Sequence, residues 1–270
     1  MRTCLLLTLF SVFGNQLLAQ VAIADTLPPT PFKIDQRYLS GLDLPKIDLK
    51  DKPDLEYFQK RIYKGTDLSI YMLGGETKVN QLENFGIDEF VYYLSGRADI
   101  TAASGNVYQF YGGDYLFVPK GFTGQWINNG GSQYHLELSV ITNKRSDSAR
   151  ISPAKEPFLL DRNMLSGIDQ HLEDAMESTT TIYEGVELRV YTHTEYPGKR
   201  AVVNKEQEEL IHILKGVLTI LPEGGEKQTY YTGDFFVLPK GFTGSWESES
   251  ADTFRTLNVT RTIAFKAAPK

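Results

Sequence analysis

The stretch GDYLFVPKGFTGQW at residues 113–126 decides the fold of this chain, because it returns as GDFFVLPKGFTGSW at residues 233–246. The copies are 120 residues apart, and so are other matched pairs such as Glu89 with Glu209 and Gly96 with Gly216. Self-similarity at one fixed offset indicates an internal duplication. The sequence therefore predicts two copies of one domain that align without net insertion or deletion.

Each copy has the sequence pattern of short β-strands. Runs of β-branched and aromatic residues at 90–94, 115–118 and 235–238 are bounded by Gly, Pro, Asn and Asp. Asp114 and Asp234 lie in the turn before such a run. Pro119 and Pro239 end it, since proline cannot donate to a central ladder. We predict an all-β protein.

Residues 1–24 have the features of a cleaved signal peptide. Arg2 precedes an apolar run at 5–12, and Ala22-Ile-Ala24 forms a cleavage site before Asp25. The apolar run is too short to span a bilayer, so we expect export with cleavage, not a membrane anchor. The predicted location is periplasmic or secreted. Cys4 leaves with this segment, which excludes disulfides and thiolate chemistry from the mature chain.

The remaining chain divides into four segments. Residues 25–56 are predicted to form an extended arm, residues 57–145 and 177–265 the two repeated domains, and residues 146–176 a linker with a short helix near 167–176. The formal net charge of -6 argues against a nucleic-acid partner, because proteins bind nucleic acids through a basic surface. A monomer and a homodimer both stay open.

A family resemblance follows from two spaced motifs. Glu89-x6-Gly96 and Glu209-x6-Gly216 match the end of the first cupin motif. The second motif, G-x5-P-x-G-x2-H-x3-N, runs from Gly113 to Asn128 and from Gly233 to Ser248. The sequence G-D-x4-P-K-G-F-T-G-x-W within this motif resembles the ureidoglycine aminohydrolase-like branch of the cupins, which includes an ethanolamine-utilisation cupin. The resemblance implies a bicupin, with one small jelly-roll barrel in each half.

The metal ligands of that family are missing from both halves. Cupin metal sites use three imidazoles and one carboxylate, a set suited to Mn or Fe. The second-motif His position holds Gly124 or Gly244, and the first-motif positions hold Asn84 with Leu82 or Asn204 with Val202. We therefore expect no metal and no other cofactor, with a divalent ion such as Mn as the alternative.

The chain has four histidines, and none completes an imidazole cluster. If Glu209 points into its barrel, strand alternation places His212 on the opposite face. His171 falls in the linker, and His135 follows the second motif. His193 with Glu195 lies on a predicted strand and suggests a one-His, carboxylate-based site. A solvated or hydrogen-bonded histidine is the alternative.

Alternation also predicts what fills the barrels instead of a metal. Trp126 and Trp246 lie two residues after the glycines of the His position, so each should face inward. Tyr93 shares the face of Glu89, whereas Ile213 shares that of Glu209, which makes the first barrel the more polar. The alternative is that each Trp fills its barrel while the Glu pairs with a neighbour such as Lys120 or Lys240. The candidate ligand-binding residues are Asn84, Glu89, Tyr93, Trp126, Glu209 and Trp246.

Three functions are compatible with these features. The first is an exported protein that binds a small polar metabolite in the first barrel. The second is an enzyme of the ureidoglycine aminohydrolase-like branch, acting on a ureide, an amino acid or a sugar-like substrate. Glu89 and Tyr93 would then be its acid–base residues, because burial raises a carboxyl pKa. The third is a structural or interaction protein with two filled barrels.

Overall fold

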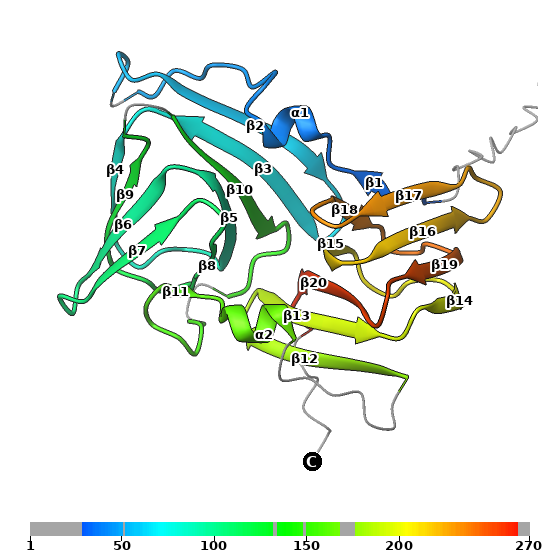
Figure 1. Ribbon diagram of the computed structural model, residues 1–270. Helices are drawn as coiled ribbons and strands as arrows, with labels where there is room; N and C mark the ends of the chain where they lie inside the picture. Colours follow the sequence, from blue (N-terminus) through cyan, green and yellow to red (C-terminus); the bar gives the residue numbers. More distant parts are fainter. Residues whose placement is uncertain (1–28, 51, 132–133, 148–149, 168–175, 264–270) are drawn as a thin grey trace, which may run out of the picture.

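The computed structural model describes residues 29–50, 52–131, 134–147, 150–167 and 176–263, and within them the chain is almost entirely β (Figure 1). The predicted signal peptide at residues 1–24 lies outside the described residues, and so does His171. No helix within the described ranges is long and apolar enough to cross a membrane. The all-β prediction is confirmed, and the strands form two barrels that lie side by side.

Barrel 1 is made of two antiparallel sheets. The larger sheet has the order β11-β8-β5-β10-β3-β2, and the smaller has the order β4-β9-β6-β7. Its strands between residues 57 and 142 are β2 (Tyr57–Lys64), β3 (Leu68–Gly75), β4 (Lys78–Leu82), β5 (Glu89–Ser95), β6 (Arg97–Ala102), β7 (Val107–Tyr111), β8 (Tyr115–Val118), β9 (Gly124–Asn129) and β10 (His135–Thr142).

Barrel 2 repeats this arrangement strand for strand. Its sheets have the orders β1-β18-β15-β20-β13-β12 and β14-β19-β16-β17. Its strands between residues 177 and 261 are β12 (Glu177–Glu184), β13 (Leu188–Glu195), β14 (Gly198–Val202), β15 (Glu209–Lys215), β16 (Val217–Pro222), β17 (Gln228–Tyr231), β18 (Phe235–Leu238), β19 (Gly244–Glu249) and β20 (Phe254–Arg261). The duplication is thus structural, and both barrels are jelly rolls.

The predicted alignment without insertion is wrong at one point. Strands β9 and β19 begin 120 residues apart, at Gly124 and Gly244, whereas β10 and β20 begin 119 residues apart. Barrel 1 therefore carries one extra residue in the loop between β9 and β10. As a result, Glu137 of β10 is the counterpart of Thr256 of β20.

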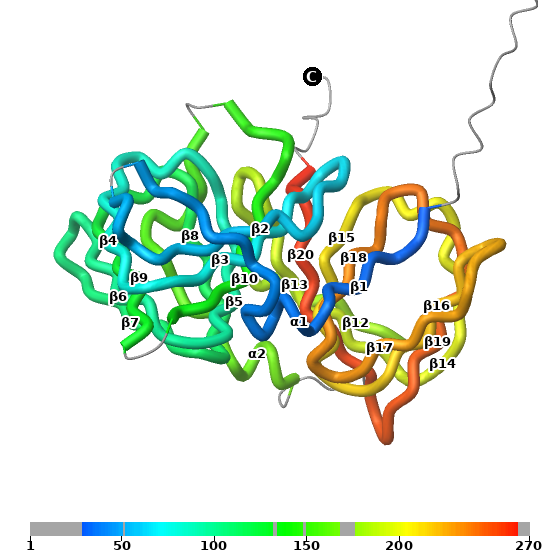
Figure 2. The backbone as a smooth tube through the Cα atoms, turned by 90° about the horizontal axis from the view of Figure 1, so that it is seen from above, coloured from blue at the N-terminus to red at the C-terminus, as the bar shows by residue number. Residues whose placement is uncertain are grey.

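The two connecting segments exchange strands between the barrels. The segment before barrel 1 contains β1 (Phe32–Lys33), which pairs with β18 of barrel 2, and α1 (Gln36–Leu39). The linker contains β11 (Phe158–Leu159), which pairs with β8 of barrel 1, and α2 (Arg162–Ser166). In Figure 2 the blue N-terminal segment lies on barrel 2 at β1 and then crosses to barrel 1, where Lys46 pairs with Phe58 of β2. Within the described residues of the predicted arm, β1 is therefore the part that joins the second barrel's sheet.

The linker contains a short helix before the one predicted near residues 167–176, which falls almost entirely outside the described residues. The helix α2 ends before Gly167, whose φ of 70° is left-handed. The Gly167 N–H donates to Asn163 O at 3.1 Å, and Asp161 accepts a hydrogen bond from Asn163 N at the start of the helix. Aspartate is a preferred N-cap and glycine a preferred end of a helix. The pair therefore sets both ends of α2.

The outer faces of the two larger sheets pack against each other in one hydrophobic cluster. This cluster joins residues of both barrels, such as Leu138 and Val140 of β10 with Leu257 and Val259 of β20. His212 is buried among these residues and stacks on Phe235 with 3.7 Å between ring centroids. The prediction that His212 lies on the face opposite Glu209 is therefore confirmed.

Candidate functional site

The inward faces of the strands form a separate core in each barrel. Tyr93 and Trp126 belong to the interior of barrel 1, and Ile213 and Trp246 to that of barrel 2. The inward orientation predicted for both tryptophans is confirmed. Strands of the larger sheets such as β5 alternate between the barrel interior, at Val91 and Tyr93, and the cluster between the barrels, at Phe90, because successive side chains point to opposite faces.

A hydrogen-bonded chain of side chains runs through barrel 1. The Trp126 indole Nε1 donates to the Tyr93 hydroxyl at 3.0 Å, and that hydroxyl donates to Asn128 Oδ1 at 2.6 Å. The Asn128 amide then donates to Glu137 Oε1 at 3.3 Å. All four side chains are buried. Tyr93 thus satisfies its hydroxyl through Asn128 and Trp126, and Glu137 ends the chain.

Glu137 is the member of this hydrogen-bonded network that has an oxygen atom without a hydrogen-bond partner among the described residues. Its side chain lies on β10 opposite Tyr93, is 5% exposed, and its Oε2 has no partner among the described residues. Burial raises the pKa of Glu137 to about 8, and the nearby Glu89 carboxylate also raises it. The carboxyl group is therefore mostly protonated at neutral pH, with one oxygen available to a further partner.

His135 offers a second unsatisfied atom on the same face of β10. Its Nδ1 lies 2.8 Å from Gly75 O, and a carbonyl oxygen only accepts, so Nδ1 carries the proton. Burial lowers the pKa of His135 to about 4, which keeps the ring neutral. Its Nε2 is thus an acceptor, and it has no partner among the described residues.

Tyr57 and Lys78 cover this part of the barrel. The Tyr57 ring lies 5.7 Å from the His135 ring, and the Lys78 ammonium lies 4.4 Å from the Tyr57 ring centroid. Burial lowers the pKa of Lys78, and the Glu137 carboxylate opposes that shift. The barrel 1 site therefore combines aromatic rings with buried polar groups. It is defined as Tyr57, Lys78, Tyr93, Trp126, Asn128, His135 and Glu137.

Of the two other predicted residues of barrel 1, Glu89 lies near Glu137 but hydrogen-bonds outside this network, and Asn84 lies apart from it. Glu89 accepts a hydrogen bond from the Ser139 hydroxyl, and burial raises the pKa of Glu89. It does not pair with Lys120, whose ammonium donates to Ser146 and lies 3.5 Å from Glu187. Asn84 is exposed in a turn with a left-handed φ of 47°, so its amide does not reach the barrel interior.

The family carboxylate of barrel 2, Glu209, is neutralised by its neighbours. It lies 2.5 Å from the Lys205 ammonium and accepts hydrogen bonds from Tyr191 and from Asn258, the latter at 2.9 Å. A cavity of about 320 Å³ opens beside this group, and exposed Asn204 lines it. Glu209 therefore pairs with a neighbouring lysine, as one of the two alternatives from the sequence proposed, but the lysine is Lys205 and not Lys240.

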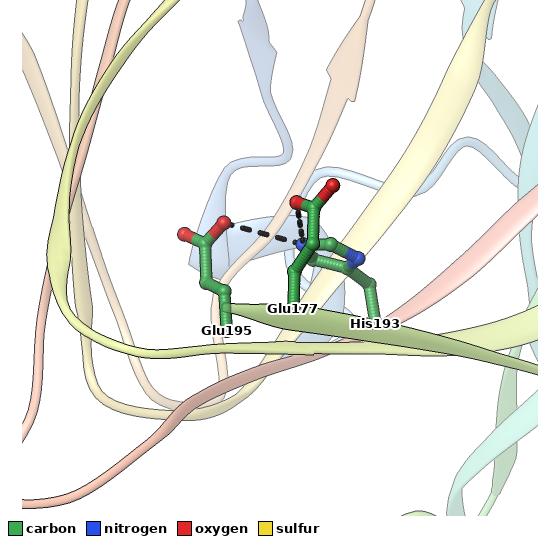
Figure 3. Close-up of side chains that lie close together, drawn as sticks. All are labelled: Glu177, His193 and Glu195. Carbon is green, nitrogen blue, oxygen red and sulfur yellow. Dashed lines mark hydrogen bonds and ion pairs between the residues drawn. The ribbon is translucent and has the colours of Figure 1, made fainter. Parts of the chain in front are cut away.

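A second carboxylate cluster lies near the other end of barrel 2. The Trp246 indole donates to Glu195 Oε1 at 2.7 Å, and His193 Nε2 lies 3.2 Å from Glu195 Oε2. Figure 3 shows Glu177 beside this pair, on the neighbouring strand. The structure therefore brings together His193 and Glu195, as the sequence suggested, and adds a third potential ligand.

The metal of the cupin family does not fit the residues at its usual position. A Cβ atom on Gly124 would lie 2.4 Å from Thr101 O and 2.6 Å from the Phe122 ring. A Cβ on Gly244 would lie 2.4 Å from Leu221 O. Real Cβ atoms do not approach so closely, so neither position accepts the missing histidine.

The sequence reasoning missed Glu137, His135 and Asn128 as site residues. His135 was set aside because it follows the second motif, and Asn128 was noted only as the end of that motif. These residues could have been found from strand alternation, because residues 135, 137 and 139 are polar and lie on one face of a β-strand. The one-residue offset of this strand obscured the comparison with barrel 2.

Comparison with known proteins supports the fold. Residues 75–129 and 185–255 match the EutQ-like cupin domain. No curated protein sequence matches the chain. The matched segments fall one in each barrel, so the chain consists of two tandem cupin barrels, and within that class both segments are similar to EutQ-like cupins.

Solved structures share this architecture at low sequence identity. A salicylate 1,2-dioxygenase from Pseudaminobacter salicylatoxidans is 13% identical, with a TM-score of 0.61 over 90% of this chain and 89% of the other. A DUF861 protein of unknown function from Pseudomonas syringae is 13% identical, with a TM-score of 0.59 over 86% and 99%. A cupin 2 conserved barrel domain protein from Leptotrichia buccalis is 15% identical, with a TM-score of 0.57 over 87% and 97%. These similarities concern the fold alone.

Proposed function

We propose that this tandem cupin binds a small polar ligand in the barrel 1 site without using a metal. The observation that carries this proposal is the pair of unsatisfied buried atoms on one face of β10, Glu137 Oε2 and His135 Nε2. A buried polar atom without a partner costs about 1–3 kcal/mol. Such an atom calls for a water or a ligand.

The two atoms define the chemistry of the ligand. A protonated Glu137 donates a hydrogen bond, and His135 Nε2 accepts one. A hydroxyl group matches both atoms chemically because it accepts and donates at once. An amine fits if it instead holds Glu137 in the ionised form. The aromatic rings of Tyr57, Tyr93 and Trp126 would contact the apolar part of a small molecule.

Barrel 2 is less suited than barrel 1 to bind a small polar ligand in its interior. Its residues at the positions of Glu137, Tyr93 and Asn128 are Thr256, Ile213 and Ser248, so the polar chain of barrel 1 has no counterpart there. Thr256 Oγ1 and Asn258 Oδ1 of β20 also have no partner among the described residues, but both belong to uncharged groups. This contrast supports the first barrel as the binding site.

The test is a thermal-shift screen of hydroxyl- and amine-bearing metabolites, followed by calorimetry on each hit. Glu137→Leu, which removes the donor and leaves the ligand hydroxyl without its partner, should weaken binding by roughly ten- to a hundred-fold. Thr256→Val, at the position of barrel 2 equivalent to Glu137, and Glu209→Gln, at the position equivalent to Glu89, should leave the affinity unchanged. Weaker binding in either of these two controls, with Glu137→Leu unaffected, would move the site to barrel 2.

Catalysis is a second candidate, favoured by the same carboxyl pair. A Glu137 group with a pKa of about 8 beside the Glu89 carboxylate can release and take up a proton near neutral pH. The substrate classes that the resemblance implies are ureides, amino acids and sugar-like molecules. Incubation with these compounds and NMR detection of products tests it. Turnover that Glu137→Gln abolishes would favour an enzyme over a binding protein.

We also propose export to the periplasm or the medium, on the strength of the sequence of residues 1–24. N-terminal sequencing of the mature protein should begin at Asp25 or within a few residues of it. Recovery of intact Met1 from soluble cytoplasm would overturn this proposal.

A further inference from the structure

Three potential metal ligands converge where β12 begins and β13 ends. Glu177 of β12 lies directly opposite Glu195 of β13, and His193 precedes Glu195 by two residues on the same face. His193 Nε2 lies 3.2 Å from Glu195 Oε2 and 3.6 Å from Glu177 Oε2 (Figure 3). One atom from each of the three side chains lies within 4.8 Å of the other two.

The pairing of Glu177 with Glu195 needs a compensating positive charge. Like charges directly opposite each other on neighbouring strands are destabilising. Arg200 supplies part of the compensation, since its Nε lies 3.3 Å from Glu195 Oε2. Glu177 is 60% exposed at its side chain and has only the His193 ring as an ion-pair partner within the described part of the chain.

Neighbouring groups hold two of the ligands in place. His193 Nδ1 lies 3.2 Å from the Thr179 hydroxyl, which leaves Nε2 directed at the carboxylates. Glu195 Oε1 accepts the Trp246 indole N–H at 2.7 Å, which leaves Oε2 directed at the histidine. Metal-binding histidines generally hydrogen-bond through their second nitrogen, and metal-binding carboxylates are themselves hydrogen-bonded. The cluster has both kinds of support.

We propose that Glu177, His193 and Glu195 form a zinc site. With zinc–ligand bonds of about 2.0–2.1 Å, the ligand atoms of a tetrahedral ion lie about 3.3 Å apart. The separations of 3.2 and 3.6 Å from His193 Nε2 to the two carboxylates are close to this value. One imidazole and two carboxylates are a donor set that zinc accepts.

The fourth position of the ion would face an open cavity. This cavity has a volume of about 200 Å³ and is lined by Glu177, Glu195, Tyr196 and Arg200, among others. Three protein ligands with an open fourth position are typical of zinc sites that bind a water or a small ligand. Arg200 at the edge favours an anionic group there.

This site is distinct from the metal position of the cupin family. Glu209, the family carboxylate, pairs with Thr260 near the end of β20, whereas Glu195 pairs with Phe254 at its start. Six residues of strand separate the two positions, about 20 Å along the barrel. The proposal is independent of the ligand site proposed for barrel 1.

The test is calorimetric titration of zinc chloride into chelator-treated full-length protein without a polyhistidine tag. Wild type should bind one zinc per chain, and Co²⁺ should give the visible absorption of a tetrahedral complex. His193→Gln should weaken zinc binding by at least about 100-fold, and Thr179→Val by about tenfold. Glu177→Gln changes an exposed side chain, so it should reduce binding in a protein that is still folded.

The matched controls are Glu184→Gln, an exposed carboxylate on the same strand, and Glu209→Gln, the family position. Both should bind zinc like wild type. Three results would each overturn the proposal: no saturable binding, wild-type binding in both His193→Gln and Glu177→Gln, or loss of binding in Glu209→Gln alone.

Discussion

Asp88 and Glu208 occupy equivalent positions in the two barrels, and each accepts hydrogen bonds from the backbone of the other barrel. Asp88 Oδ2 accepts from the Glu187 N–H at 2.8 Å and from the Leu188 N–H at 3.3 Å. Glu208 Oε2 accepts from the Asp67 N–H at 2.7 Å and from the Leu68 N–H at 3.4 Å. The barrels are therefore joined by an approximately two-fold interface within one chain.

This relationship explains two of the repeated glycines. A Cβ atom on Gly65 would lie 1.6 Å from Glu208 Oε1, and one on Gly185 would lie 2.2 Å from Asp88 Oδ2. Each carboxylate thus fills the space that a side chain would need. The exchange of β1 and β11 follows the same symmetry, as in an interface between two identical subunits.

The first prediction concerns the stability that this interface supplies. Asp88→Ala removes a buried carboxylate that also accepts the Lys120 N–H at 2.8 Å, and it leaves backbone donors unsatisfied. The free energy of unfolding should fall by about 3 kcal/mol or more. Glu208→Ala should act in the same direction. Urea denaturation measures both, and Asp252→Ala, a change at the exposed surface, should leave the midpoint unchanged.

The second prediction concerns the exchanged N-terminal segment. Ile34 follows β1, is fully buried in the cluster between the barrels, and donates its N–H to Phe235 O at 2.9 Å. Ile34→Ala should lower the free energy of unfolding by about 2–5 kcal/mol, the usual cost of such a cavity. Leu42→Ala, in the same segment but 58% exposed, is the control. Equal denaturation curves for the two variants would show that the segment does not hold barrel 2.

The third prediction tests why the family histidine is missing. Gly124→Ala forces a Cβ against Thr101 O, a backbone atom that cannot move without shifting β6. Its unfolding temperature should drop clearly, and Gly124→His should fail to create metal binding at that position. Gly86→Ala is the matched control, because no atom lies within 4 Å of its added Cβ. A Gly124→Ala protein as stable as wild type would remove the steric explanation.

The fold was predictable because the duplication shows the same pattern of strands and turns twice in the sequence. Strands β8 and β18 lie at the predicted residues 115–118 and 235–238. The strand exchange was not predicted, since its own repeat has a different offset. PF-x-x-D followed by LSG occurs at residues 31–41 and again at 157–167, which is 126 residues later. A repeat search at one spacing misses a second spacing.

The site was predictable only where it depended on strand alternation. Tyr93 and Trp126 do face inward and do meet, but their partner is Asn128, not Glu89. Asn84 was assigned by counting from a motif, and the left-handed turn at that position turns it to the surface. Partners that come together from different strands depend on register, which motif spacing does not specify.

The last prediction concerns the pH dependence that Glu137 gives to stability. Its pKa is raised from 4.5 to about 8 in the folded state, so the folded protein holds a proton that the unfolded chain has released between these values. The free energy of unfolding therefore decreases as pH rises through this window. His135 and His212, whose pKa values burial lowers to about 4 and about 3, act in the opposite direction, mainly below pH 7.

Comparing wild type with Glu137→Gln isolates the contribution of this carboxyl, because the histidines are common to both. Between pH 6 and pH 8 wild type should lose about 2 kcal/mol of stability relative to the variant, at about 1.4 kcal/mol per pH unit below the folded pKa. Thr256→Val, at the equivalent position of barrel 2, carries no titrating group and should follow the wild-type curve. Guanidinium denaturation at several pH values gives these differences. If the wild-type and Glu137→Gln curves run parallel from pH 6 to pH 8, the carboxyl is already ionised in the folded protein, and it has no proton with which to donate a hydrogen bond to a ligand hydroxyl.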